Sequence, residues 1–243
     1  MDAREYEILY SVEDHHWWYR GLHRLLGNQW RRHMHLHAPA VLDVGCGTGG
    51  VLQQLHHAGF TVGLDIAQDA LRYCQARSLT TLVQGSAVSL PLPDATFDAT
   101  VMLDVLYHRQ VPDKLASLHE CHRVLRRGGV LFLNVPAYQW LYSSHDVGIH
   151  TDHRFTRREV SRLLQEASFE IQFLSYWNCL LLPGILPVRL VRKWSSHRGS
   201  DLRNTGDTPL NKALGAALRA ERWWLRHARL PFGLSIFAVG KKR

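Results

Sequence analysis

The 243-residue sequence has few cysteines and no long apolar segment. Its four cysteines are far apart and form no Cys-x-x-Cys pair, which argues against a disulfide framework or a zinc site. The longest apolar run, Cys179–Pro187, contains Gly184 and two prolines and is too short to span a bilayer. Because the first residues also lack the basic and apolar leader of a signal peptide, we expect a cytoplasmic protein.

Positive charge is not concentrated in any long run. The formal net charge is +8 at pH 7, but the positive residues are scattered, apart from short pairs and the tail Lys241–Arg243. Scattered arginines usually form a solvated face, so the charge argues against a nucleic-acid partner and leaves an anionic ligand or a membrane surface open. Internal repeats and low-complexity tracts are lacking as well.

Short apolar runs alternate with helical patterns through the middle of the chain. Helices are predicted at 15–37, 49–58, 69–77 and 112–125. Strands are predicted at 40–44, 60–64, 80–83, 97–103 and 130–135. This alternation predicts βαβ units and a mostly parallel sheet, that is, an α/β fold.

The last third of the chain has a different order. The segment 156–167 begins with a capping box, Thr156 and Glu159, and two further strands are predicted at 169–177 and 232–239. A long insertion separates these strands, and such insertions are more often functional than idle. Helix-like stretches lie in it at 180–194 and 208–229. The chain therefore divides into an N-terminal helical cap (1–37), a core (38–177), a helical insertion (178–231) and a final strand with a basic tail (232–243).

Glycines crowd the turn after the first predicted strand. Gly45, Gly47 and Gly49 lack a Cβ, so the backbone can turn tightly and a ligand can approach it. The spacing also matches the dinucleotide-binding fingerprint, so the loop alone does not identify its ligand. Asp65, at the end of the second strand, can accept hydrogen bonds from both ribose hydroxyls, which dinucleotides share with S-adenosylmethionine (SAM).

Asp43 distinguishes these two ligands. It lies on the first strand just before Gly45, where a pyrophosphate would meet its negative charge. SAM has no phosphate and carries sulfonium and ammonium groups, which a carboxylate attracts. The structural alternative is a partly buried acid that is satisfied by N–H groups of the loop.

Four motifs together resemble those of class I SAM-dependent methyltransferases, in the family's order over about residues 38–177. They are Val41–Gly49 (VLDVGCGTG), Leu64–Ile66 (LDI), Leu90–Asp98 (LPLPDATFD) and Glu120–Gly129 (ECHRVLRRGG). The most similar group is the small-molecule methyltransferases that include the ubiquinone and menaquinone enzymes. The resemblance implies a Rossmann-like, seven-stranded, mostly parallel sheet with an antiparallel last strand.

The resemblance also implies which residues bind SAM. After the third strand the family often has an acid followed by Ala; this chain has Ser86 and Ala87, so we expect a weaker contact to the adenine amino group. In similar enzymes an N-terminal aromatic segment folds over the cofactor, which places Tyr19 or Arg20 near the SAM carboxylate. The predicted cofactor-binding residues are Tyr19, Arg20, Asp43, Gly45, Cys46, Gly47, Gly49, Asp65, Ile66, Ser86, Ala87, Leu103 and Asp104.

Two loops at the carboxyl ends of strands are expected to receive the methyl acceptor. Asp104–His108 lacks the Asn/Asp-Pro-Pro-Tyr motif of enzymes that methylate DNA amines or glutamine, and its His108 is either a base or a brace for the loop. Residues 136–155 are rich in aromatics, histidines and carboxylates; these could hold a divalent metal, but without a fixed spacing we predict none. The predicted catalytic residues are His108, Tyr138, His145 and Asp146.

We therefore expect a SAM-dependent methyltransferase for a small, apolar or amphipathic acceptor such as a quinone, an isoprenoid or a natural product. The insertion 178–231 has apolar residues followed by cations, which indicates a lid over an amphipathic or anionic substrate, or a peripheral membrane contact. The alternatives are an RNA or protein methyltransferase and a non-catalytic SAM-binding regulatory subunit. The sequence indicates no obligate protein partner.

Overall fold

The computed structural model describes residues 3–183, 208–225 and 227–243, and in these residues seven strands form one sheet. The strand order is β3-β2-β1-β4-β5-β7-β6, and β7 alone runs opposite to the other six strands. The strands are β1 (Ala40–Val44), β2 (Phe60–Asp65), β3 (Leu82–Gln84), β4 (Phe97–Leu103), β5 (Leu125–Pro136), β6 (Phe169–Trp177) and β7 (Ser235–Lys242). The predicted Rossmann-like sheet with an antiparallel last strand is confirmed.

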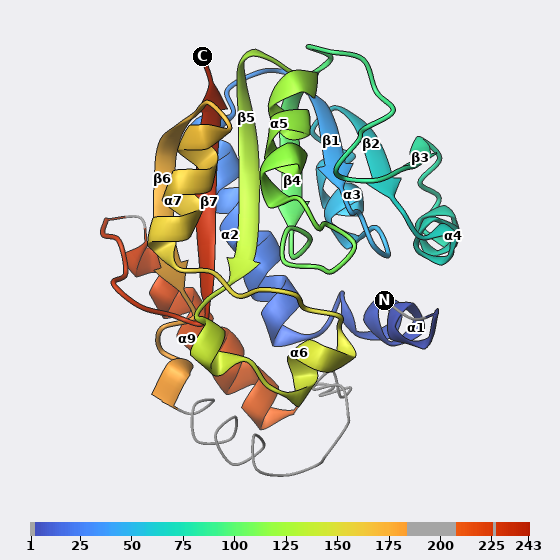
Figure 1. Ribbon diagram of the computed structural model, residues 1–243. Helices are drawn as coiled ribbons and strands as arrows, with labels where there is room; N and C mark the ends of the chain where they lie inside the picture. The colour runs from blue at the N-terminus through green and yellow to red at the C-terminus, as the bar shows by residue number, and fades with distance from the viewer. Residues whose placement is uncertain (1–2, 184–207, 226) are drawn as a thin grey trace.

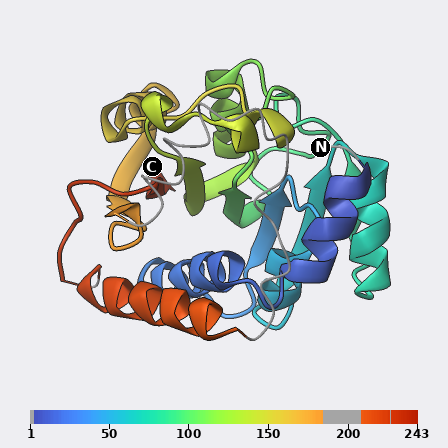
Figure 2. The same ribbon diagram turned by 90° about the horizontal axis from the view of Figure 1, so that it is seen from below.

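Helices cover both faces of the sheet (Figures 1 and 2). They are α1 (Ala3–Val12), α2 (Trp17–His33), α3 (Gly50–Leu55), α4 (Gln68–Ala76), α5 (Lys114–Val124), α6 (Ser144–Gly148), α7 (Arg157–Glu166) and α9 (Pro209–Trp224), with a 3₁₀ turn η1 (Gln139–Leu141). Helices α5 and α7 pack on one face, and α2, α3 and α9 pack on the other, with α9 outside α2.

Strand periodicity produces these two layers, because successive side chains point to opposite faces. On β1, Leu42 is fully buried in the cluster with α5 and α7, and Val41 is fully buried in the cluster with α2 and α3. A strand buried on both faces is a continuous apolar run in the sequence, which is why the parallel strands could be predicted. Among the described residues, no helix is long and apolar enough to cross a membrane.

Several predicted boundaries were wrong. Helix α1 precedes the predicted helix at 15–37 and was not predicted as a separate helix. Strand β5 begins at Leu125, five residues early, because Leu125 pairs with Phe97 of β4. Strand β7 begins only at Ser235, because Ser235 pairs with the last residues of both neighbouring strands, Pro136 of β5 and Trp177 of β6. The predicted helix 180–194 lies largely outside the described residues.

Candidate active site at the glycine loop

The glycine loop connects β1 to α3 at the carboxyl end of the sheet. The N–H of Gly45 donates to the Leu64 carbonyl at 2.7 Å, which fixes the loop to β2. Gly45 has φ 73°, and a Cβ there would collide with Val105, so packing requires this glycine. Gly47 has φ 52°, but the nearest atom to a Cβ would be Leu9 Cδ2 at 3.6 Å. Gly47 is therefore the position at which a ligand can approach the main chain beneath α1.

Asp65 ends β2 and holds the loop from the other side. Its Oδ2 accepts a hydrogen bond from the Gly47 N–H at 3.0 Å, and its Oδ1 accepts one from the Ala67 N–H at 2.9 Å. Burial raises the pKa of this carboxyl, and the hydrogen bonds from the two backbone N–H groups lower it in part. Each carboxylate oxygen has a second lone pair, so the geometry leaves acceptor capacity for ribose hydroxyls. The ribose contact stays a prediction.

Two further carboxylates lie beside the loop. Asp43 is 3 % exposed, and no hydrogen-bond donor among the described residues is paired with its carboxylate. Burial raises the pKa of Asp43, and the charges of Glu13 and Asp65 raise it further. Glu13 accepts a hydrogen bond from the Thr48 hydroxyl at 2.5 Å and pairs with Arg77 at 3.2 Å. Three acids around one loop disfavour a phosphate and favour a cationic ligand.

Helix α1 covers the loop and packs beside α4 (Figure 2). Tyr6 is buried, and the pKa of its phenol is raised by burial and by the charge of Asp65. The Tyr10 ring contacts the Tyr73 ring of α4 in a tilted arrangement with centroids 4.9 Å apart, while Leu9 faces Gly47. A cofactor that contacts Gly47 therefore has to displace Leu9. The bare main chain at Gly47 and the acids beside it fit a cationic nucleoside such as SAM.

The remaining predicted cofactor residues surround this loop with different degrees of exposure. Ile66 is 42 % exposed next to Asp65, so its side chain is open to a ligand. Ser86 accepts a hydrogen bond from the Val88 N–H at 3.4 Å, which engages its hydroxyl locally. Gly49, with φ 86°, is the N-cap of α3. Three others contact the apolar clusters: Cys46 and Ala87 are part of them, and Leu103 packs against one.

The structure separates the two N-terminal candidates. Tyr19 lies near Asp104, whose charge, together with burial as the larger cause, raises the pKa of the phenol. Arg20 lines a hollow of about 280 Å³ between α2 and α3, together with Glu13 and Gly50. Tyr19 thus lies near the end of β4 and Arg20 lies beside α3. Contact of either side chain with SAM stays a prediction.

Asp104 follows β4 at the carboxyl edge of the sheet, with φ 58°. Its Oδ1 accepts a hydrogen bond from Asn134 Nδ2 at 2.8 Å, and Asn134 Oδ1 accepts one from the Trp177 indole N–H at 2.8 Å. Burial raises the pKa of Asp104 to about 7, although the hydrogen bond from Asn134 lowers it. The charge of Asp104 contributes to the raised pKa of the Tyr19 and Tyr107 phenols, so both lie near it. A carboxyl that titrates near neutral pH is suited to proton transfer.

His108 has a different environment. Its Nδ1 accepts a hydrogen bond from the Gln110 N–H at 3.2 Å, and its buried Nε2 has no partner among the described residues. Burial lowers the pKa of His108 to about 4, so the ring is neutral at pH 7 and is a weak base. The side chain of His145, on α6, lies outside the described part of the chain. Within that part, no three His, Cys, Asp or Glu side chains form a metal site.

The loop after β5 contains the other predicted catalytic residues. Tyr138 is stacked between Trp140 and Tyr176, at centroid distances of 5.6 and 5.1 Å. Asp146 is 1 % exposed and pairs with Arg154 at 2.6 Å. The Arg154 guanidinium also donates to the Ala137 carbonyl at 2.9 Å, so the pair joins two parts of the loop. This is the geometry of a structural ion pair, and catalysis by Asp146 stays a prediction.

Sequence reasoning missed several residues of the site. Glu13 and Leu9 at the glycine loop carried no signal, because their positions depend on how the chain turns between α1 and α2. Asn134 did carry one: it is a polar residue within the apolar run 130–135, at the carboxyl end of a strand. A fully buried polar side chain at that place is expected to orient a neighbour by hydrogen bonding.

Known proteins that are similar to this chain are methyltransferases. Residues 42–133 match the family model described as a methyltransferase domain. A probable SAM-dependent methyltransferase of Mycolicibacterium smegmatis is 32 % identical over 54 % of this chain and 52 % of the relative. A demethylmenaquinone methyltransferase of Lysinibacillus sphaericus is 34 % identical over 42 % of this chain and 49 % of the relative. A ubiquinone biosynthesis O-methyltransferase of Chromobacterium violaceum is 28 % identical over 68 % of this chain and 83 % of the relative. The chain spans about half the length of the first two relatives.

Solved structures show the same fold. A Thermotoga maritima SAM-dependent methyltransferase, described as a possible histamine N-methyltransferase, has a TM-score of 0.63 and 17 % identity, covering 99 % of this chain and 96 % of its own. A Haloferax volcanii methyltransferase in complex with the Trm112 activator has a TM-score of 0.62 and 18 % identity, covering 98 % and 93 %. Residues 42–133 therefore resemble a methyltransferase domain, and the described residues have the Rossmann-like fold of the solved methyltransferases; this resemblance and this fold imply SAM as the cofactor.

Proposed function

We propose that the protein transfers the methyl group of SAM to a small, apolar or amphipathic organic acceptor of the quinone, isoprenoid or natural-product kind. The observation that carries the SAM assignment is Asp43, a buried carboxylate with no described hydrogen-bond donor, beside the main chain at Gly47, which only the Leu9 side chain covers among the described residues. The names of two relatives, a demethylmenaquinone methyltransferase and a ubiquinone biosynthesis O-methyltransferase, support a quinone-like acceptor.

The residues of the site have separate roles in this proposal. Bound SAM supplies a methyl group on a sulfonium, which is already a good leaving group. Asp65 holds the ribose, and Asp43 attracts the positive charge of the methionine part. The remaining task of the protein is to align the acceptor lone pair with the methyl group and to exclude water. Helix α1 and the loop after β5 enclose the site from two sides (Figure 1).

We assign the proton-accepting role to Asp104 in preference to His108. The pKa of Asp104 is raised to about 7 and that of His108 is lowered to about 4, so of these two residues Asp104 is the one that titrates near neutral pH. An acceptor hydroxyl that reacts loses its proton, and Asp104 receives it at its carboxylate. Tyr138, stacked on Trp140 and Tyr176, forms an apolar wall for the acceptor.

Isothermal calorimetry of SAM binding tests the cofactor site. Asp43→Asn and Asp65→Asn keep the size of each side chain but remove its charge, and we expect each to weaken SAM binding at least tenfold. Asp69→Asn is the matched control, because Asp69 lies nearby on α4 in an exposed pair with Arg72. If all three variants bind SAM like the wild type, the proposed cofactor site is wrong.

Transfer of a labelled methyl group from SAM tests the acceptor class. The purified chain is incubated with hydroxylated quinone precursors, aromatic natural products, bulk RNA and a protein extract. We expect label in the quinone or aromatic fraction, and label confined to RNA or protein would overturn the acceptor assignment. Tight SAM binding with no labelled product would instead favour a regulatory subunit. We also propose that no obligate partner is needed, and activity of the isolated chain checks this.

A further inference from the structure

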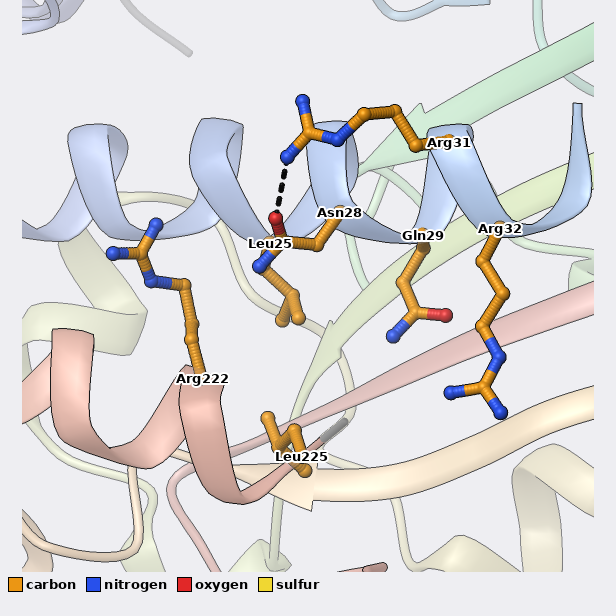
Figure 3. A pocket seen from close by; sticks show the side chains of 7 residues that line it. All are labelled: Leu25, Asn28, Gln29, Arg31, Arg32, Arg222 and Leu225. Atoms are coloured by element: carbon orange, nitrogen blue, oxygen red, sulfur yellow. Dashed lines mark hydrogen bonds between the residues drawn. The ribbon is translucent and has the colours of Figure 1, made fainter. Parts of the chain in front are cut away.

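Helix α9 packs on the sheet only through α2. Figure 2 shows α9 outside α2, which lies between α9 and the sheet. The inward side of α9 buries Leu218 and Leu225 in the cluster that includes Leu25 of α2, and Figure 3 shows Leu25 and Leu225 facing one another across this contact. Packing against α2 therefore covers one side of α9 and leaves the opposite side outward.

The outward side of α9 carries an apolar stripe. Its members, all exposed, are Ala213, Ala216, Ala220, Trp223 and Trp224. The first four follow one another at intervals of three or four residues, which places them on one face of the helix. The rings of Trp223 and Trp224, at the end of the helix, are 62 % and 56 % exposed. Contiguous exposed apolar side chains of this kind mark an interaction surface.

The exposed charges of α2 and α9 are all positive. Helix α2 contains no acidic residue, and the one acid of α9, Glu221, is 3 % exposed and accepts a hydrogen bond from the Leu180 N–H. The pKa of Arg24 is lowered by burial and by the charges of Arg20 and Arg219, so these three guanidinium groups lie near one another. They form no ion pair with any described residue. The charge beside the apolar stripe is therefore complementary to an anionic surface.

We propose that the outward side of α9 docks on the surface of an anionic lipid bilayer. A tryptophan ring combines a large apolar area with an indole N–H, so Trp223 and Trp224 suit the boundary between acyl chains and headgroups. Arg24 and Arg219 attract anionic headgroups, and their long side chains can extend to the headgroups while the apolar stripe is buried. A nucleic acid would contact the arginines but would leave the apolar stripe in water. A bilayer accounts for both features.

Co-sedimentation with lipid vesicles at low ionic strength tests this docking on the full chain. The vesicles consist of phosphatidylcholine alone or of phosphatidylcholine with phosphatidylglycerol. We expect the wild type to bind the anionic vesicles at least tenfold more tightly, because basic residues near an anionic surface add to the affinity. One test variant combines Trp223→Ser with Trp224→Ser, and the other combines Arg24→Gln with Arg219→Gln. Each should lose at least tenfold in affinity for the anionic vesicles.

Two matched controls remove the same kinds of group elsewhere on the surface. Leu36→Ser with Phe60→Ser replaces two apolar side chains that are each 58 % exposed. Arg127→Gln with Arg158→Gln removes two exposed cations of β5 and α7. We expect less than a twofold change in affinity in either control.

The outcomes distinguish a bilayer from other anionic partners. The proposal is overturned if the wild type binds neither kind of vesicle or both equally, or if a control loses as much affinity as its test variant. Binding only to an acidic polypeptide or to RNA would also overturn it. Should a double variant fail to fold, its single variants replace it. Both test variants should bind SAM like the wild type in calorimetry, so a failure of this proposal is distinct from a failure of the proposed cofactor site.

Discussion

At the scale of single residues, Ala substitutions at Gly47 and Gly128 distinguish the cost of backbone strain from the loss of a ligand contact. Both have positive φ, 52° and 81°, and an added Cβ would meet no atom closer than 3.6 Å at either position. We expect Ala at either position to cost about 1 kcal/mol of folding free energy. Only Gly47→Ala should weaken SAM binding, by tenfold or more in calorimetry, because its methyl group points into the space beneath α1. Equal SAM affinity in the two variants would contradict this role for Gly47.

Asp104 links stability to pH at the same scale. Its folded-state pKa of about 7 lies above the ordinary value of 3.8, so the folded state keeps a proton that the unfolded state releases. The stability of the protein should therefore fall as the pH rises from about 4 to about 7. Asp104→Asn removes this loss, and we expect its Tm to match the wild type at pH 4 and to exceed it by several degrees at pH 8.

The same variant should lose most methyl transfer, since the amide accepts no proton. When a functional group destabilises the folded protein, its replacement commonly raises stability and lowers activity. A lower Tm for Asp104→Asn than for the wild type at pH 8 would show that the carboxylate is stabilising and that the proposed role of its burial is wrong.

At the scale of elements, Arg77 connects the segment between α1 and α2, which contains Glu13 and Asp14, with the glycine loop, where it donates a hydrogen bond to the Thr48 carbonyl. It pairs with buried Glu13 at 3.2 Å and with Asp14, whose side chain is 49 % exposed, at 2.9 Å. Glu13→Ala leaves the buried Thr48 hydroxyl without its acceptor and removes one partner of Arg77, which should cost about 3 kcal/mol. Asp14→Ala should cost at most about 1 kcal/mol, because exposed pairs contribute little. Urea unfolding measures both costs, and equal values would refute a special role for Glu13.

The elements also show what the sequence could predict. The capping box of α7 was confirmed, with Thr156 Oγ1 accepting from the Glu159 N–H at 3.2 Å, because such a motif is local. Asp43 and Asp65 could be placed because each lies on or at the end of an apolar strand. The Asn134–Trp177 hydrogen bond and the covering helix α1 could not, because these contacts join segments whose spacing in the chain carries no pattern.

At the scale of the whole molecule, the N-terminal segment and the sheet share one core. Helix α2 buries Leu25 and Leu26 in the same cluster as Val41 and Phe132 of the sheet. The Trp30 ring stacks on Phe132 with centroids 5.4 Å apart. The boundary between 1–37 and 38–177 stays a prediction, but this packing indicates that α2 and the sheet unfold together as one cooperative unit.

Two leucines test this cooperativity. Leu26 is 0 % exposed in α2, whereas Leu36, just beyond the helix, is 58 % exposed. Leu26→Ala should lower the free energy of unfolding by about 2–5 kcal/mol through the cavity that it leaves, and Leu36→Ala should change it by less than about 0.5 kcal/mol. Urea unfolding followed by tryptophan fluorescence and far-UV circular dichroism should give one transition in each variant, with both probes shifted together. If Leu26→Ala gave an early transition in fluorescence alone, the helical cap would unfold independently, and residues 1–37 would be a domain separate from the sheet.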